Sequence, residues 1–139
     1  MGKRDHALVR YLWAFPATVV GLILAVIALV LGGRARLVDG ILEVGGGRLN
    51  VLLARVPGSL RIGAVTFGHV IVGVDRAELD RSRAHEQVHV RQYERWGILF
   101  FPLYLGSSLN LLLRGRSPYW ENRFEREARR ESAEARTAT

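Results

Sequence analysis

The strongest constraint on the fold is an apolar run near the N-terminus, which has no charged side chain over residues 11–31. About 20 apolar residues is the length of a helix that crosses the hydrocarbon core of a bilayer. Tyr11 and Trp13 at its start fit an aromatic belt at the membrane interface, and Pro16 falls in the early turns, where a kink is tolerated. The run therefore predicts a transmembrane helix.

A cleaved signal peptide is the alternative for this segment. Basic residues precede the run at positions 3, 4 and 10, and Gly33-Arg34-Ala35 has the small-x-small spacing of a cleavage site. The apolar run is longer than the usual core of a signal peptide, which favours a retained anchor. Arginines also follow the run, so the distribution of basic residues leaves the side of the membrane open.

The length of 139 residues leaves room for one small domain besides the anchor. We expect residues 1–35 to carry the anchor and residues 36–139 to form the domain. The net charge of +7 suits contact with the anionic headgroups of a lipid bilayer. Because no aromatic and basic recognition motif accompanies the charge, we expect no nucleic-acid partner. Cysteine is absent, which excludes disulfides and thiolate metal ligands. Nothing in the sequence indicates the oligomeric state.

Glycine and proline divide residues 37–74 into short β-rich runs. The triplet Gly45-Gly46-Gly47 and the pair Pro57-Gly58 have the composition of turns, and each run between such turns is at most eight residues long. We therefore expect a small antiparallel β-meander that the next helix covers on one face. The expected strands lie within residues 37–44, 49–56, 62–67 and 69–74.

The next segment carries His85-Glu86-Gln87-Val88-His89, which has the pattern H-E-x-x-H. We expect it on a helix that begins within residues 75–79, runs through Trp96 and stops at Gly97. Two histidines four residues apart share one helix face and can hold one metal ion, while Glu86 is turned about a hundred degrees aside. A catalytic Zn²⁺ ion takes such histidines, a third ligand and a water, and a neighbouring glutamate accepts the proton of that water.

The third protein ligand must be His, Asp or Glu, because the chain has no cysteine. The last predicted helix, residues 119–135, offers Glu121 and Glu125, which share one helix face. In one register Glu121 is the ligand and Glu125 is its supporting partner. A solvated helix whose charged side chains only pair with one another is a further alternative.

The segment Phe124-Glu125-Arg126-Glu127-Ala128 resembles the F/Y-E-x-E-A stretch of gluzincin-type zinc metallopeptidases, in the membrane-bound family of Ste24-like and HtpX-like proteases. The resemblance implies that Glu125, the first glutamate of the stretch, is the third zinc ligand. Residues 60–130 also resemble a group of small uncharacterised bacterial membrane proteins, which implies a bacterial cell membrane as the location. The larger proteases have an aspartate where this chain has Arg129, and they have further membrane helices.

A second apolar segment, residues 98–113, separates the histidines from these glutamates. It is shorter than the first run and is interrupted by Pro102, Gly106 and Asn110. Such interruptions are more usual in re-entrant, interfacial or protein-covered segments than in a simple span. If the segment crossed the bilayer, the histidines and glutamates would lie on opposite sides, so we expect it to return to the side from which it started.

The expected fold is α+β and minimally zincin-like, with a transmembrane helix, an antiparallel meander, the H-E-x-x-H helix, the re-entrant or interfacial segment and a C-terminal helix. The expected function is that of a membrane-anchored zinc metallopeptidase, with Glu86 as general base and a peptide or protein as substrate. A non-catalytic zinc-binding scaffold is the alternative, and a chance match of the pentapeptide is a third reading. His69, Tyr93 and Tyr119 are candidates for contacts with the substrate or its developing oxyanion, although each also fits a structural role.

Overall fold

The structure is a computed structural model that describes residues 3–55 and 62–139. Its fold is α+β, as predicted, with four strands in one sheet within these residues. In chain order the elements are α1 (Lys3–Val30), β1 (Arg34–Val38), β2 (Ile41–Gly45), α2 (Arg48–Ala54), β3 (Ala64–Phe67), β4 (Val70–Gly73), α3 (Arg76–Trp96), the short 3-10 helix η2 (Gly97–Leu99), α4 (Phe100–Leu113) and α5 (Arg123–Thr137).

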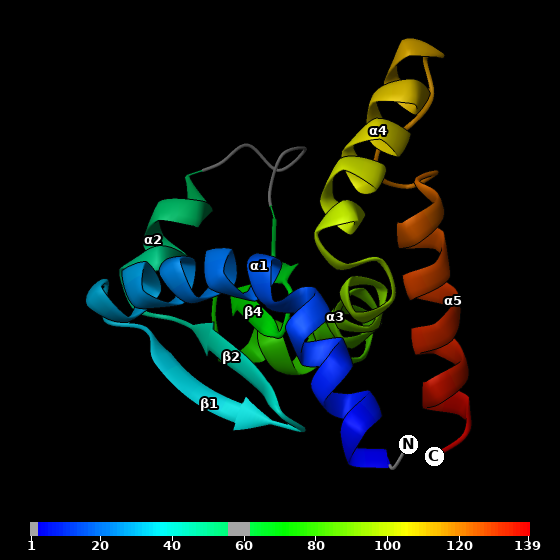
Figure 1. The fold of residues 1–139 in the computed structure, drawn as a ribbon. Helices are drawn as coiled ribbons and strands as arrows, with labels where there is room; N and C mark the ends of the chain where they lie inside the picture. The colour runs from blue at the N-terminus through cyan, green and yellow to red at the C-terminus, as the bar shows by residue number, and fades with distance from the viewer. Residues whose placement is uncertain (1–2, 56–61) are drawn as a thin grey trace.

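The four strands form a mixed sheet in the order β1-β2-β4-β3. β1 pairs antiparallel with β2 and β3 pairs antiparallel with β4, but β2 and β4 run parallel, so the predicted antiparallel meander is wrong. The reason is the run at residues 49–56, of which residues 49–54 belong to helix α2 and not to a strand (Figure 1). A helix in this connection carries the chain across the sheet, so that β4 returns beside β2 in the same direction. The turn predicted at Pro57-Gly58 lies outside the described residues.

The sheet lies between α1 and α3. The cluster on the side of α1 contains Ala25, Ala28, Val44 and Val70. The cluster on the side of α3 contains Ile41, Ile71, Leu79 and Val90. Neighbouring residues of a strand point to opposite faces, so Val70 serves the first cluster and Ile71 the second. Because both faces of the central strands are covered, the sequence of β4 is apolar throughout its length.

Small residues form one face of α1. The buried members of this alanine face are Ala14, Ala17, Ala25 and Ala28. Between them lies Gly21, where a Cβ atom would be 2.7 Å from the carbonyl oxygen of Phe67, so glycine allows the helix to approach the sheet closely. The remaining surface of α1 exposes large apolar side chains. The stretch His6–Val30 is long and apolar enough to cross a membrane.

Local signals determine the bounds of α3. The side chain of Asp75 caps the helix by accepting a hydrogen bond from the backbone N–H of Glu78 at 2.8 Å. Gly97 ends the helix with a φ of 59°, a conformation that glycine adopts without strain. The predicted start within residues 75–79 and the predicted stop at Gly97 are confirmed.

α4 leads away from α3, and the segment after it brings the chain back to α3 (Figure 1). The chain turns after Leu113, and α5 then lies beside α3 (Figure 1). Asn122 stabilises the return: its side chain accepts from the backbone N–H of Phe124 at 3.0 Å, as the N-cap of α5, and donates to the hydroxyl of Ser108 at 2.8 Å. Residues 98–113 are therefore helical, and the chain after them leads back to the histidines. The location of residues 98–113 in a membrane stays a prediction.

Candidate metal centre

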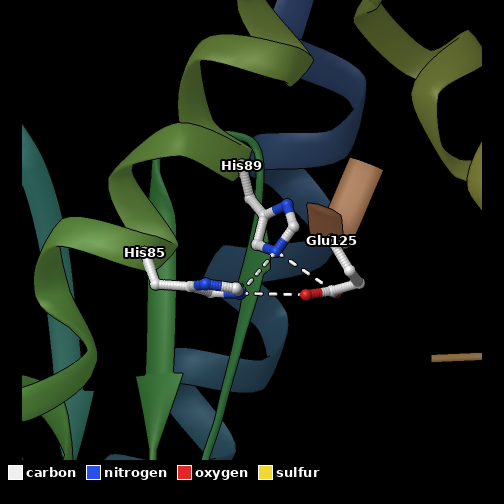
Figure 2. Close-up of side chains that lie close together, drawn as sticks. All are labelled: His85, His89 and Glu125. Atoms are coloured by element: carbon white, nitrogen blue, oxygen red, sulfur yellow. Dashed lines mark hydrogen bonds and ion pairs between the residues drawn. The ribbon is translucent and has the colours of Figure 1, made fainter. Parts of the chain in front are cut away.

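Three side chains from two helices converge on one point (Figure 2). His85 and His89 lie one turn apart on α3, and Glu125 lies in the first turn of α5. The Glu125 carboxylate is 2.9 Å from His85 Nε2 and 3.3 Å from His89 Nε2. The two Nε2 atoms are 3.2 Å apart. Together these side chains form a group that could hold a metal ion, and we call His85, His89 and Glu125 the metal-binding group.

The side chain of Gln92 determines which nitrogen of His89 faces this point. The Gln92 amide nitrogen donates to the Phe124 carbonyl at 3.1 Å and to the Glu127 carboxylate at 2.8 Å. Since both partners are only acceptors, the amide oxygen must point the other way, toward His89. His89 Nδ1 lies 2.8 Å from that oxygen and therefore carries a proton. In the neutral ring, Nε2 is then an acceptor.

Two acceptors therefore face each other at the centre, His89 Nε2 and Glu125 Oε1, at 3.3 Å. Only a proton or a cation between them makes this contact favourable. Burial would raise the pKa of Glu125, but its hydrogen bonds with His85 and His89 outweigh burial and hold that pKa well below its usual range. Burial would lower the pKa of His89, but Glu125 beside it produces a net rise in that pKa. A bound metal ion would supply the positive charge that this arrangement favours.

Two hydroxyl groups hold the carboxylates of the site. Thr66 Oγ1, on β3, donates to Glu86 Oε2 at 2.7 Å, and the buried Glu86 faces the same cavity as the histidines. The Tyr104 hydroxyl, on α4, donates to Glu125 Oε1 at 2.7 Å. Sequence reasoning missed both Thr66 and Tyr104, because neither belongs to a motif and each contact joins residues about twenty positions apart in the chain. Of the three residues that support the site, Thr66, Tyr104 and Gln92, only Gln92 could have been found from the sequence, because it shares a helix face with His85 and His89.

The metal-binding group lies in the wall of a cavity of about 250 Å³. Apart from this group and Glu86, most of the lining is apolar and comes from β3 and α4, including Val65, Phe67, Phe100 and Phe101. β3 is an edge strand of the sheet. A mostly apolar cavity with a few converging polar groups is the usual form of a ligand-binding site.

The structure places Glu121 away from this group. Its carboxylate accepts from Arg116 Nε at 2.9 Å and from the backbone N–H of Ser117 at 3.1 Å. The hydrogen bond from Arg116 holds the pKa of Glu121 below its usual value. Arg129 lies over the rings of Tyr119 and Trp120. Of the two glutamates considered from the sequence, Glu125 is the one that the fold brings to the histidines.

The other predicted contact residues divide between two places. Tyr93 and Tyr119 line the cavity, and Tyr93 is almost fully buried. His69 lies outside it: the ring pairs with Glu94 at 3.0 Å and stacks on Tyr11 with ring centroids 4.1 Å apart. His69 therefore links α1 to α3, while contacts of Tyr93 and Tyr119 with a substrate stay predictions.

The fold and these side chains define a small α+β protein with an apolar N-terminal helix and a His-His-Glu group able to hold a metal ion. No protein-family model, curated protein or solved structure matches this chain. The family resemblance noted in the sequence therefore stays a prediction, and the function must be inferred from the geometry of the site.

Proposed function

We propose that this protein is a membrane-anchored zinc metallopeptidase of minimal zincin-like type. The observation that carries the proposal is the convergence of His85, His89 and Glu125 in the wall of a cavity that Glu86 also lines. This is the combination that the H-E-x-x-H pattern requires: two imidazoles and a carboxylate as ligands, and a second carboxylate beside them as base.

The donor atoms fit a zinc ion in type and in spacing. Imidazole and carboxylate groups suit this metal, and donors about 2.0–2.2 Å from a tetrahedral zinc ion lie about 3.3–3.6 Å apart. The three closest separations here are 2.9, 3.2 and 3.3 Å, so a small outward movement of the side chains is sufficient. A bound zinc ion lowers the pKa of a water ligand to about 7 and polarises a carbonyl group.

Glu86 acts as the general base in this mechanism. It accepts a proton from the attacking water and delivers it to the leaving amine nitrogen as the peptide C–N bond breaks. The hydrogen bond from Thr66 fixes one oxygen of Glu86 and leaves the other free for the proton. Gln92 holds His89 in the tautomer that presents Nε2 as a ligand.

The cavity suits a peptide in extended conformation. β3 contributes four consecutive residues to its lining, Ala64 to Phe67, and as an edge strand it offers backbone groups for pairing. A substrate strand added to this edge would place a scissile carbonyl near the metal-binding group, with apolar side chains in the cavity. The exposed apolar surface of α1 supports a location at a membrane, and the bacterial cell membrane is the one that the resemblance implies.

The variant Glu86→Gln tests the proposal. Its side-chain oxygen still accepts from Thr66, so we expect the purified full chain to bind stoichiometric zinc and to hydrolyse a peptide library about 10²- to 10⁴-fold more slowly. The control is Glu78→Gln, which makes the same charge change on α3 away from the cavity lining. Undiminished hydrolysis by Glu86→Gln would refute the mechanism. A wild-type protein that holds zinc but cleaves nothing would instead favour a non-catalytic zinc-binding scaffold.

A further inference from the structure

A second depression, which we call the basic hollow, lies between the C-terminal end of α3 and the adjacent α5, which run side by side (Figure 1). Its volume is about 400 Å³. Two aromatic side chains, Trp96 and Phe124, form part of its lining. The charged side chains of the lining are Arg95, Arg123, Arg126, Arg130 and Glu127.

The positive charge of the basic hollow is not balanced by its own carboxylate. Glu127 is 3.8 Å from Arg95, but it also accepts the hydrogen bond from Gln92. Arg130 has Glu134 at 4.0 Å, but Arg123 and Arg126 form no ion pair with any of the residues that the structure describes. Like charges one helical turn apart repel each other, so an anion bound among these arginines would stabilise the arrangement.

The geometry of the arginines suits a phosphate group. Residues 123, 126 and 130 are spaced by three and four positions, so the three guanidinium groups project from one face of α5. The guanidinium of Arg123 lies over the ring of Phe124, 5.1 Å from its centroid, which restricts its motion. Planar guanidinium groups bind phosphate oxygens in pairs, and they are more weakly hydrated than ammonium groups.

An exposed apolar band adjoins the basic hollow. Trp96 is followed by Gly97, which packs so closely on Trp13 of α1 that a Cβ atom would lie 2.7 Å from the indole ring. Trp13 is exposed, and so are Ile98 and Leu99 directly after Gly97. Charged groups thus border large apolar side chains within a few residues of one another, as headgroups border acyl chains in a bilayer.

We propose that the basic hollow binds the headgroup of an anionic phospholipid, with the phosphodiester among Arg123, Arg126 and Arg130 and the acyl chains along the exposed apolar band. An anionic phospholipid has a negatively charged headgroup next to its apolar chains, so it can contact the arginines and the exposed apolar band at once. A free phosphate would contact the arginines alone. The site is separate from the cavity that contains the metal-binding group, so this inference does not depend on the proposed peptidase activity.

Thermal unfolding of the full chain in a neutral detergent tests the inference. Short-chain phosphatidylglycerol is added at increasing concentration, and short-chain phosphatidylcholine and inorganic phosphate are added in parallel. A ligand that binds only the folded state raises the unfolding midpoint with its concentration. We expect phosphatidylglycerol to raise the midpoint, and the other two compounds to leave it unchanged at the same concentration.

A matched pair of triple variants locates the effect. Each arginine near an anionic lipid surface contributes about fivefold to binding, so the combination Arg123→Gln, Arg126→Gln and Arg130→Gln should weaken the response to phosphatidylglycerol by at least tenfold. The control combination changes residues 34, 76 and 81 from Arg to Gln and alters the net charge equally. If phosphatidylcholine raised the unfolding midpoint as much as phosphatidylglycerol, the site would not select an anionic headgroup. If inorganic phosphate raised it as much, the ligand would be a free phosphate and not a lipid. Equal losses in the two triple variants would overturn the location.

Discussion

Replacing Gln92 by leucine removes the only amide that links His89 to α5 among the described residues, while keeping a side chain of similar size. Gln92 is buried, and its removal leaves His89 Nδ1 without the acceptor it has in the structure, whereas the Phe124 carbonyl keeps its hydrogen bond within α5. An unpaired buried polar group costs about 1–3 kcal/mol. The expected free energy of unfolding of the metal-free protein therefore falls by about 1–3 kcal/mol.

The effect on metal binding is a separate quantity. Without the acceptor at Nδ1, the His89 ring loses both its orientation and the preference for the tautomer that presents Nε2. Removal of a hydrogen-bond partner of this kind costs about 10- to 100-fold in metal affinity. We therefore expect Gln92→Leu to weaken zinc binding by that factor, without changing the number of zinc ions bound at saturation.

A competition titration against a coloured zinc chelator measures the affinity, and denaturant unfolding measures the stability. Gln87→Leu is the control, since Gln87 is the same residue type on the same helix but lies outside the metal-binding cavity. Zinc affinity within twofold of wild type in a folded Gln92→Leu variant would refute the role assigned to this amide. An equal loss in Gln87→Leu would attribute the effect to α3 in general.

Three further outcomes are expected. Glu125→Gln removes a metal ligand and should weaken zinc binding about 100- to 1,000-fold, because structural zinc sites gain about 3–4 kcal/mol from each ligand; Glu121→Gln should leave it unchanged in the same titration, and the reverse order would contradict the ligand assignment. Thr66→Val should keep zinc but lower the rate of peptide hydrolysis about 10- to 100-fold, because Glu86 loses its orientation; an unchanged rate would show that Glu86 needs no such support. Zinc affinity should fall on acidification, because the ion must displace a proton from His89, whose pKa is raised by Glu125 in spite of burial. The fall should therefore begin at a higher pH than for an ordinary histidine, and an affinity independent of pH would contradict this reasoning.

Features set by local chemistry could be predicted from the sequence. The bounds of α3 follow from Asp75 and Gly97, which act on the helix within one turn of its ends. The shared face of His85 and His89 follows from helical spacing. The return of the chain after α4 could also be anticipated, because a carboxylate from the last helix can meet these histidines only if the chain turns back.

Features that depend on contacts between distant segments could not be predicted. The run that forms α2 is short and rich in leucine, and periodicity alone does not distinguish a short buried helix from a strand. Once that run is a helix, the parallel pairing of β2 with β4 depends on how the chain crosses the sheet. The hydrogen bonds from Thr66 to Glu86 and from Tyr104 to Glu125 likewise arise only when β3 and α4 meet α3 and α5.

The alanine face makes α1 part of the hydrophobic core as well as an apolar surface. Ala14 and Ala17 pack on Tyr93, Phe100 and Phe124, the aromatic residues that join α3, α4 and α5. Loss of the helix, by proteolytic processing or by shortening the gene to obtain a more soluble product, would expose these rings to water and loosen the two helices that supply the metal ligands. We therefore expect a chain cut after residue 35 to lose the arrangement of His85, His89 and Glu125 together with its apolar helix.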